Sequence, residues 1–381
     1  MFYLLFLKKY IIMKLTFYKV SRVLHEKNVV FCVWEKGGKL TLESHKMSII
    51  YGGSMSFIIV KDLNKTFKVL QRDSGLINAF KTLFKRRYTE IKAVDNISLN
   101  IDKGEIVAYI GPNGAGKSTT IKMLTGILKP DSGYIRVDGF DPFKDRIKYV
   151  KNIGVVFGQK SQLWWDIPVI DSFLILKDIY KISEKDFKNR LDELVDLLDI
   201  NEFIKTPLRQ LSLGQRMRCE IAASLLHNPK VLFLDEPTIG LDAVSKIQVR
   251  KFIKEINKKH KVTIILTSHD MSDIEALTNR VIVIGHGKKL YDGTLTDIKK
   301  KFDKIKKVEI LFNKISKIPN IKNVEVIEKS NDKVLLNVDM NTNTVSSVIR
   351  EYSKVCEIND VNVIPSNIDN IIVKLYQEYN L

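Results

Sequence analysis

One glycine-rich run constrains the fold of this 381-residue chain more than any other segment. Its residues are Gly111, Pro112, Asn113, Gly114, Ala115, Gly116, Lys117 and Ser118. The spacing is that of a phosphate-binding loop, whose backbone N–H groups point at phosphate oxygens. EIVAYI before the run is typical of a strand and TTIKMLTGIL after it of a helix, which is the context that such a loop needs. The run predicts a nucleotide site with Lys117 on the β- and γ-phosphates and Ser118 on Mg²⁺.

Two further strand ends carry polar residues that suit phosphate chemistry. The apolar residues 231–234 predict a strand buried on both faces, and Asp235 and Glu236 follow it. Open α/β sheets bind their ligands at such strand ends. Asp235 suits the Mg²⁺ shell, and Glu236 suits orienting and deprotonating an attacking water. The strand 262–267 precedes His269, which is predicted either to bond the γ-phosphate or to be a structural residue.

A third segment, Leu211–Gln215, stands before the helical pattern RMRCEIAASLL. Its small residues are expected to leave free N–H groups at a helix N-terminus, which makes a second anion site. One nucleotide fills two such sites only if they meet across an interface. The segment therefore predicts a dimer in which each ATP lies between one chain's phosphate loop and the partner's Ser-Leu-Gly-Gln turn.

In this order the motifs resemble the ATP-binding subunit of an ABC transporter. The resemblance covers about 55–298 and, more weakly, the tail. It implies an α/β fold of the P-loop NTPase class with ATP and Mg²⁺ as cofactors. Beyond the phosphate loop, the residues that it places at the nucleotide or the metal are Phe67, Thr119, Gln159, Ser212, Gly214, Gln215, Asp235 and Asp242, with Glu236 and His269 as catalytic residues.

The resemblance also implies individual roles for several of these residues. Gln159 would touch Mg²⁺ and sense the permease, and Asp242 would couple the two sites of the dimer. His269 resembles the switch histidine. Phe67 resembles the aromatic residue that stacks on adenine, with Tyr88 as its rival. Leu213 stands where the family more commonly has glycine, and phosphate contact is expected to survive this change.

The chain divides into four regions of different sequence pattern. Residues 1–54 have no sustained periodicity and are expected to be either translated leader, with the true start at Met55, or a family-specific extension. Residues 55–298 form the predicted ATPase domain, and 160–228 its helical subdomain. The tail, 299–381, is predicted to be a small α+β domain that does no chemistry. Its strands are KVEILF, NVEVIEK and KVLLNVD, with a hairpin turn at 330–332 and then a helix, TVSSVIREYSKV.

Composition limits the partners. The chain has 62 basic and 44 acidic residues, a net charge of +18, of which 1–54 contribute +6. An excess of this size fits nucleic acid or an anionic membrane surface, but the lysines are scattered, which favours a compositional origin. The apolar runs are far shorter than the ~20 residues that a membrane-spanning helix needs. Three widely spaced cysteines indicate neither a disulfide framework nor a zinc site.

The resemblance implies an ATPase that powers transport through separately encoded permease subunits at the cytoplasmic face of the membrane. The inserted Ser74–Glu90 segment, the stretch 159–165 and the tail resemble a bacterial subgroup that exports drugs or other amphiphiles. Trp164 and Trp165 are expected to dock the permease, with burial in the helical subdomain as the alternative. Homodimer and heterodimer both remain open.

Two alternative functions belong to other classes. A soluble ABC-type ATPase acting on ribosomes or nucleic acid is kept open by the basic charge. A chromosome-maintenance ATPase does not fit, because Lys117 and Ser212 lie only 95 positions apart and leave no room for a long coiled coil. A catalytically dead regulatory subunit is disfavoured by the presence of Lys117, Glu236 and His269.

Overall fold

The computed structural model describes residues 33–34, 40–41, 56–70, 88–158, 160–302, 304–313, 318–364 and 368–379. The chain divides into two units, Met1–Gly53 and Ser54–Leu381. In the first, the described residues form one antiparallel pair, β1 (Val33–Trp34) with β2 (Leu40–Thr41). The predicted start at Met55 lies outside the described residues.

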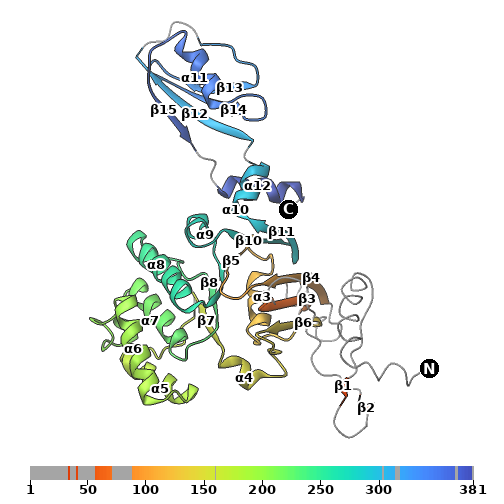
Figure 1. Ribbon diagram of the computed structural model, residues 1–381, viewed down its shortest axis with the longest axis vertical. Coiled ribbons are helices and arrows are strands. Elements are labelled where there is room, and N and C mark those ends of the chain that lie inside the picture. The colour runs from red at the N-terminus through yellow and green to blue at the C-terminus, as the bar shows by residue number, and fades with distance from the viewer. Residues whose placement is uncertain are drawn as a thin grey trace, which may run out of the picture. The chain divides into compact units, whose positions relative to one another are not determined.

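A six-stranded sheet in the order β11-β10-β5-β9-β8-β7 is central to the second unit (Figure 1). Its strands are β5 (Ile106–Ile110), β7 (Ile153–Phe157), β8 (Val231–Asp235), β9 (Thr263–Thr267), β10 (Arg280–Gly285) and β11 (Lys288–Thr294). Neighbours from β10 to β7 pair in parallel, as predicted, and β11 runs antiparallel to β10. The carboxyl ends of β5, β8 and β9 therefore meet at one edge, where open α/β sheets bind ligands.

The two faces of this sheet belong to two different hydrophobic cores, because side chains alternate along a strand. On β8, Leu232 and Leu234 join one cluster and Val231 and Phe233 the other. The helices that flank the strands are α3 (Lys117–Leu124), α4 (Arg146–Val150), α8 (Ala243–His260), α9 (Met271–Leu277) and α10 (Leu295–Phe302).

Helix α3 ends four residues before its predicted end at Leu128. Gly126 adopts a φ of 73°, a left-handed conformation that ends helices. It directly follows Thr125, the C-cap residue of α3. The sequence prediction therefore extended the helix beyond the glycine that ends it.

The helices and strands described within 160–228 are all helices, which matches the helical pattern of the sequence. Their elements are α5 (Val169–Tyr180), α6 (Glu184–Leu198), the short 3₁₀ helix η1 (Leu208–Gln210) and α7 (Leu213–Leu225). A second, antiparallel sheet packs into the other core in the order β4-β3-β6. Its strands are β3 (Ile58–Leu70), β4 (Tyr88–Ile101) and β6 (Ser132–Val137).

The tail contains a four-stranded antiparallel sheet, β13-β14-β12-β15, with a core of its own. The elements are β12 (Ile305–Phe312), β13 (Val324–Lys329), β14 (Lys333–Asp339), α11 (Val345–Ser353), β15 (Ile358–Ile364) and α12 (Ile368–Glu378). The predicted hairpin turn at 330–332 is confirmed, since Ser330 N donates to Lys333 O at 2.9 Å. Among the described residues, no helix combines the length and apolar character that crossing a membrane requires.

Candidate active site

The phosphate loop connects β5 to α3 and needs its glycines for space and conformation. Gly114 and Gly116 have φ angles of 81° and 102°, which side chains disfavour. A Cβ at Gly116 would also collide with the Ala93 carbonyl of β4. Gly116 is the N-cap of α3, and no side chain caps this helix. The first N–H groups of α3 are thus left for an anion, as the motif predicts.

Lys117 is folded back over this loop. Its side chain is 6% exposed, and Nζ donates to the carbonyls of Gly111 at 2.7 Å and Pro112 at 3.1 Å. Burial lowers the pKa of Lys117, while the carboxylates of Glu236 and Asp235 act in the opposite direction. The lysine of one motif therefore lies within electrostatic reach of the acids of another.

A hydroxyl fixes the two acids at the end of β8. Thr267 Oγ1, at the end of β9, donates to Asp235 Oδ1 at 2.6 Å. Glu236 N donates to the Thr267 carbonyl at 3.1 Å. Glu236 has a φ of 57°, and a non-glycine residue in such a conformation costs roughly 1–3 kcal/mol. Glu236 lies directly after the end of β8, and its carboxylate reaches His269 in the loop after β9.

Glu236 and His269 meet directly in the structure. His269 Nε2 lies 2.8 Å from Glu236 Oε1, and both side chains are partly exposed. They line a cavity of about 440 Å³ together with Gly240, Lys246 and Asp369. The two residues that the sequence assigned to catalysis thus form one acid–imidazole pair.

The side-chain oxygen atoms of Ser118 and Asp235 suit Mg²⁺ as ligands. Mg²⁺ typically takes one or two protein oxygens and completes its shell with water and phosphate. Ser118 is exposed at the start of α3, and Asp235 keeps its second carboxylate oxygen apart from the Thr267 bond. The third predicted ligand, Gln159, lies outside the described residues. Thr119, next to Ser118, is half-buried in the first turn of the same helix.

The Leu211–Gln215 turn differs from its prediction. Its N–H groups were expected to be free, but Gln215 N donates to Ser212 Oγ at 3.2 Å and Ser212 N donates to Gln215 Oε1 at 2.9 Å. This reciprocal pair is a capping box at the start of α7. The expectation of free groups was wrong for these two residues, because the Ser-x-x-Gln spacing satisfies them internally.

The start of α7 packs against the start of α8. A Cβ on Gly214 would collide with Ser245 Oγ, so only glycine allows this approach. Asp242 caps α8 by accepting from the backbone N–H groups of Val244 and Ser245, both at 2.9 Å, and from Ser245 Oγ at 2.7 Å. The hydrogen bonds from Ser245 and Val244 lower the pKa of Asp242. Its coupling role stays a prediction, but its structural role is evident.

Both aromatic candidates for adenine stacking are exposed on the β3–β4 hairpin. Phe67 is 38% exposed and pairs with Ile91, and Tyr88 is 51% exposed. Lys65 Nζ lies 5.8 Å from the centre of the Phe67 ring. Phe67 lies nearer in register to Ala93, the residue that touches the phosphate loop, and it stays the favoured candidate.

Trp164 and Trp165 are exposed, at 42% and 51%, so their burial in the helical subdomain is excluded. The Arg216 guanidinium lies 5.2 Å from the centre of the Trp165 ring, which connects this stretch to α7. The neighbouring helix α5 adds exposed apolar side chains at Leu174, Ile175 and Ile179.

Two buried acids were missed by the sequence argument. Glu220 on α7 accepts from Ser161 Oγ and, at 3.1 Å, from Gln162 N. Burial raises the pKa of Glu220. It ties the segment after Gln159 to the helix that starts at Ser212. An acid on an otherwise buried helix face, between Cys219 and Ile221, was the available signal.

Asp273 on α9 is 1% exposed and joins three other elements. It accepts from Thr238 Oγ1, from Ser268 Oγ at 3.1 Å and from Arg250 Nε at 2.5 Å. These contacts fix the segment after Glu236, the loop of His269 and helix α8 to one another. Nothing in the local sequence pattern distinguishes this aspartate from a surface residue.

Comparisons with known proteins agree with a nucleotide-binding site of this kind. The ABC transporter family model matches residues 94–239. The ABC transporter ATP-binding protein NatA of Bacillus subtilis is 34% identical over 215 residues, which are 56% of this chain and 87% of NatA. The linearmycin resistance ATP-binding protein LnrL of B. subtilis is 34% identical over 56% of this chain and 68% of its own. A solved dimeric ATP-binding cassette, bound to ADP and Pi, has 26% identity and a TM-score of 0.52 over 62% of this chain and 98% of its own.

Proposed function

Because this chain belongs to the ATP-binding proteins of ABC transporters, we propose that it hydrolyses ATP as a dimer and drives export through separately encoded permease subunits. The observation that carries the proposal is the cluster of Lys117, Asp235, Glu236 and His269 at one edge of the parallel sheet. In this cluster a phosphate-binding lysine lies near acids that can serve a metal and a water. Such a cluster suits transfer of a phosphoryl group to water.

The phosphate loop binds the nucleotide. Backbone N–H groups of Asn113, Gly114 and Gly116 and the uncapped start of α3 surround the β- and γ-phosphates. Lys117 exchanges its two carbonyl contacts for phosphate oxygens, because a charge-assisted hydrogen bond to phosphate is stronger than one to a neutral carbonyl. Ser118, Asp235 and Gln159 would hold Mg²⁺, which supplies neutralisation of phosphate charge when bound.

Glu236 acts as the general base for the attacking water. Its carboxylate is held 2.8 Å from His269 Nε2, so the two side chains can exchange a shared proton or each turn toward the nucleotide. In the ATP-bound state, His269 turns to the γ-phosphate and leaves Glu236 to the water. The pair therefore forms the resting arrangement, and nucleotide separates it.

The Ser212 turn completes the site of the partner subunit. The γ-phosphate of the same chain is bound at the start of α3 and not at the start of α7. Ser212 and Gly214 therefore act on the nucleotide of the partner subunit. Gln215 holds the turn in shape through the capping box. Asp242, at the start of α8 beside the Ser212 turn, couples the two nucleotide sites of the dimer. The relative that was solved as a dimer with ADP and Pi supports this assembly.

The surface formed by Trp164, Trp165, Leu174, Ile175 and Ile179 is the proposed docking site of the permease. It follows Gln159 directly in the chain, and Glu220 connects it to α7. Movement of the permease can thus reach the Ser212 turn through one helix. The similarity to a linearmycin resistance protein supports export of an amphiphile, and the peripheral position at the inner membrane face follows from permease docking.

The test is the variant Glu236→Gln, which retains shape but loses the base. We expect its ATP hydrolysis to fall about a thousandfold, the middle of the range for general-base catalysis, while ATP still binds. In saturating ATP it should accumulate as a dimer in size-exclusion chromatography with light scattering. Persistence as a monomer in ATP, with Mg²⁺ present or withheld, would contradict the dimer mechanism.

A further inference from the structure

Helix α12 is the last described element of the chain, yet it packs into the core of the ATPase part. Its buried apolar residues are Ile368, Ile371, Ile372 and Leu375, each at most 3% exposed. They share one cluster with Leu295 and Ile298 of α10 and with Ile274 and Leu277 of α9. The tail sheet has a separate core around Val308, Leu336 and Tyr352.

The far end of α12 is fixed by polar contacts. Glu378 Oε2 forms an ion pair with Lys301 Nζ of α10 at 2.9 Å. Tyr379 donates its hydroxyl to the Leu290 carbonyl of β11 at 3.1 Å. These contacts hold the C-terminal end of α12 against α10 and β11, at the opposite end of the helix from Asp369.

The near end of α12 reaches the catalytic cavity. Asp369, in its first turn, lines the 440 Å³ cavity that also contains Glu236, His269 and Lys246. Lys246 Nζ donates to Asp270 Oδ2 at 2.6 Å. Asp369 therefore lines the same cavity as Lys246, the cation that holds the residue next to His269.

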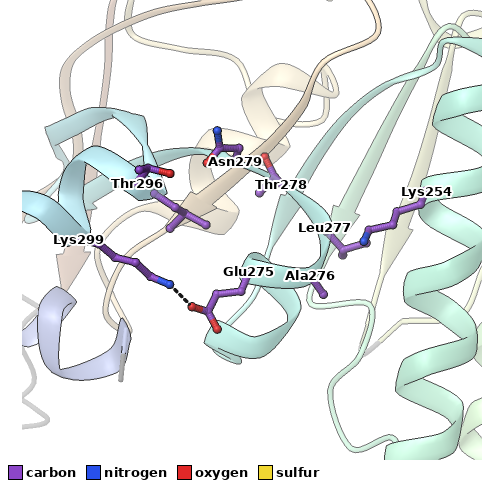
Figure 2. A pocket seen from close by; sticks show the side chains of 9 residues that line it. Lys254, Glu275, Ala276, Leu277, Thr278, Asn279, Thr296 and Lys299 are labelled. Carbon is purple, nitrogen blue, oxygen red and sulfur yellow. Dashed lines mark hydrogen bonds and ion pairs between the residues drawn. The ribbon is translucent and has the colours of Figure 1, made fainter. Parts of the chain in front are cut away.

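Helix α9, which begins two residues after His269, is held at its last turn and borders the catalytic cavity with its first turn. Its last turn carries Glu275, which pairs with Lys299 of α10 at 2.6 Å. Figure 2 shows this pair bridging α9 and α10 beside a cavity of about 380 Å³, whose lining includes Lys254 and Thr296. The first turn of α9, with Met271, borders the other cavity, which Asp369 also lines.

In the chain, the tail sheet lies between α10 and α12. The chain leaves the ATPase part at the end of α10, builds β12 to β15, and returns as α12. Both connections of the tail sheet therefore lead to helices that hold α9. The covalent path from the tail sheet to the catalytic loop thus runs through α10 and α12.

We propose that α12 positions the His269 loop for hydrolysis, with Asp369 as its positioning residue. The proposal rests on the catalytic roles proposed for Glu236 and His269. Asp369 acts on the loop and does not touch the nucleotide. Its loss should slow the chemical step without weakening ATP binding.

The experiment compares Asp369→Ala with Glu378→Ala in the full-length protein. Both variants remove one carboxylate from α12, but only Asp369 lines the catalytic cavity. We expect Asp369→Ala to lower kcat about fivefold, roughly 1 kcal/mol of barrier, with KM for ATP unchanged. Glu378→Ala should keep wild-type kcat, and Asp369→Glu should restore most of the loss. Thermal stability measures whether either variant is merely destabilised.

Amide hydrogen exchange over 268–277 provides a readout that does not depend on activity. Exchange there should be faster in Asp369→Ala than in Glu378→Ala, because the proposed support of the first turn of α9 is lost. Wild-type kcat and exchange in Asp369→Ala would overturn the proposal, as would equal loss in both variants. If Glu236→Gln hydrolyses ATP normally but Asp369→Ala still loosens the loop, the proposed catalytic roles fail and the positioning contact stands.

Discussion

Helices α3 and α7 both begin at small residues, but their first turns are satisfied in opposite ways. Helix α3 starts at Gly116 with no capping side chain. Helix α7 starts at Ser212 with a complete capping box to Gln215. The N–H groups of α3 are left for phosphate in the same chain, whereas α7 has already used two of its own.

The difference accounts for the proposed division of roles, in which α3 binds nucleotide within one chain and α7 acts across a dimer. An open helix N-terminus with a lysine beside it attracts an anion from solvent. A capped turn gains little from a distant anion, and it contributes only when a second subunit brings a phosphate within hydrogen-bond distance. Variants at the two turns should therefore fail at different steps.

Lys117→Ala should have the largest effect, and it should act on ATP binding. The lysine supplies charge-assisted hydrogen bonds to phosphate, and their loss is expected to weaken ATP affinity about 100-fold. Equilibrium binding of a fluorescent ATP analogue to the monomer measures this. Lys122→Ala, on the exposed side of the same helix, is the control and should bind normally. Equal loss in both variants would show that α3 is merely destabilised.

Ser212→Ala should bind ATP as a monomer but hydrolyse it about tenfold more slowly, because one phosphate contact across the dimer is lost. It should also lose about 1 kcal/mol of stability from the missing cap. Ser183→Ala is a matched control, since Ser183 caps α6 by accepting from Asp186 N at 3.2 Å. It should show the same loss of stability in chemical denaturation and normal hydrolysis. Slow hydrolysis in both would mean that stability alone explains the effect.

The sequence predicted the open turn fully and the capped turn only partly. The phosphate loop is a local motif, and its strand, loop and helix follow from adjacent residues. The Ser-x-x-Gln spacing of a capping box is present in the sequence too, but the prediction of an anion site rested on the small residues before the helix and did not use that spacing. The Glu236–His269 pair and the contacts of Asp273 join residues from different strands and helices, so only the tertiary structure reveals them. The packing of α12 into the ATPase core was hidden for the same reason.

Mixing two damaged chains tests the division of roles between the turns. In a mixed dimer of Lys117→Ala and Ser212→Arg, one composite site receives both defects and the other combines an intact phosphate loop with an intact Ser212 turn. ATPase activity should partly return when the two nearly inactive proteins are mixed, provided that one intact site can turn over. Continued inactivity is informative when cross-linking shows that mixed dimers form, since it would mean that the two sites work only together.

The smallest effects should come from Gln215, and they decide whether this residue serves the cap or the nucleotide. Gln215→Ala frees Ser212 N at the cost of about 0.5 kcal/mol of helix stability. Since Ser212 is exposed, water can satisfy the released group, and hydrolysis should fall by less than about threefold. Gln215→Glu retains a capping box, because glutamate also reaches back to the N-cap N–H, but it places a negative charge near the partner's γ-phosphate. It should therefore fold as stably as the wild type and yet dimerise more weakly in ATP. Chemical denaturation and light scattering separate the two properties. If Gln215→Ala instead abolishes ATP-driven dimerisation without a loss of stability, Gln215 contacts the nucleotide directly, and the capped state of α7 opens when the dimer closes.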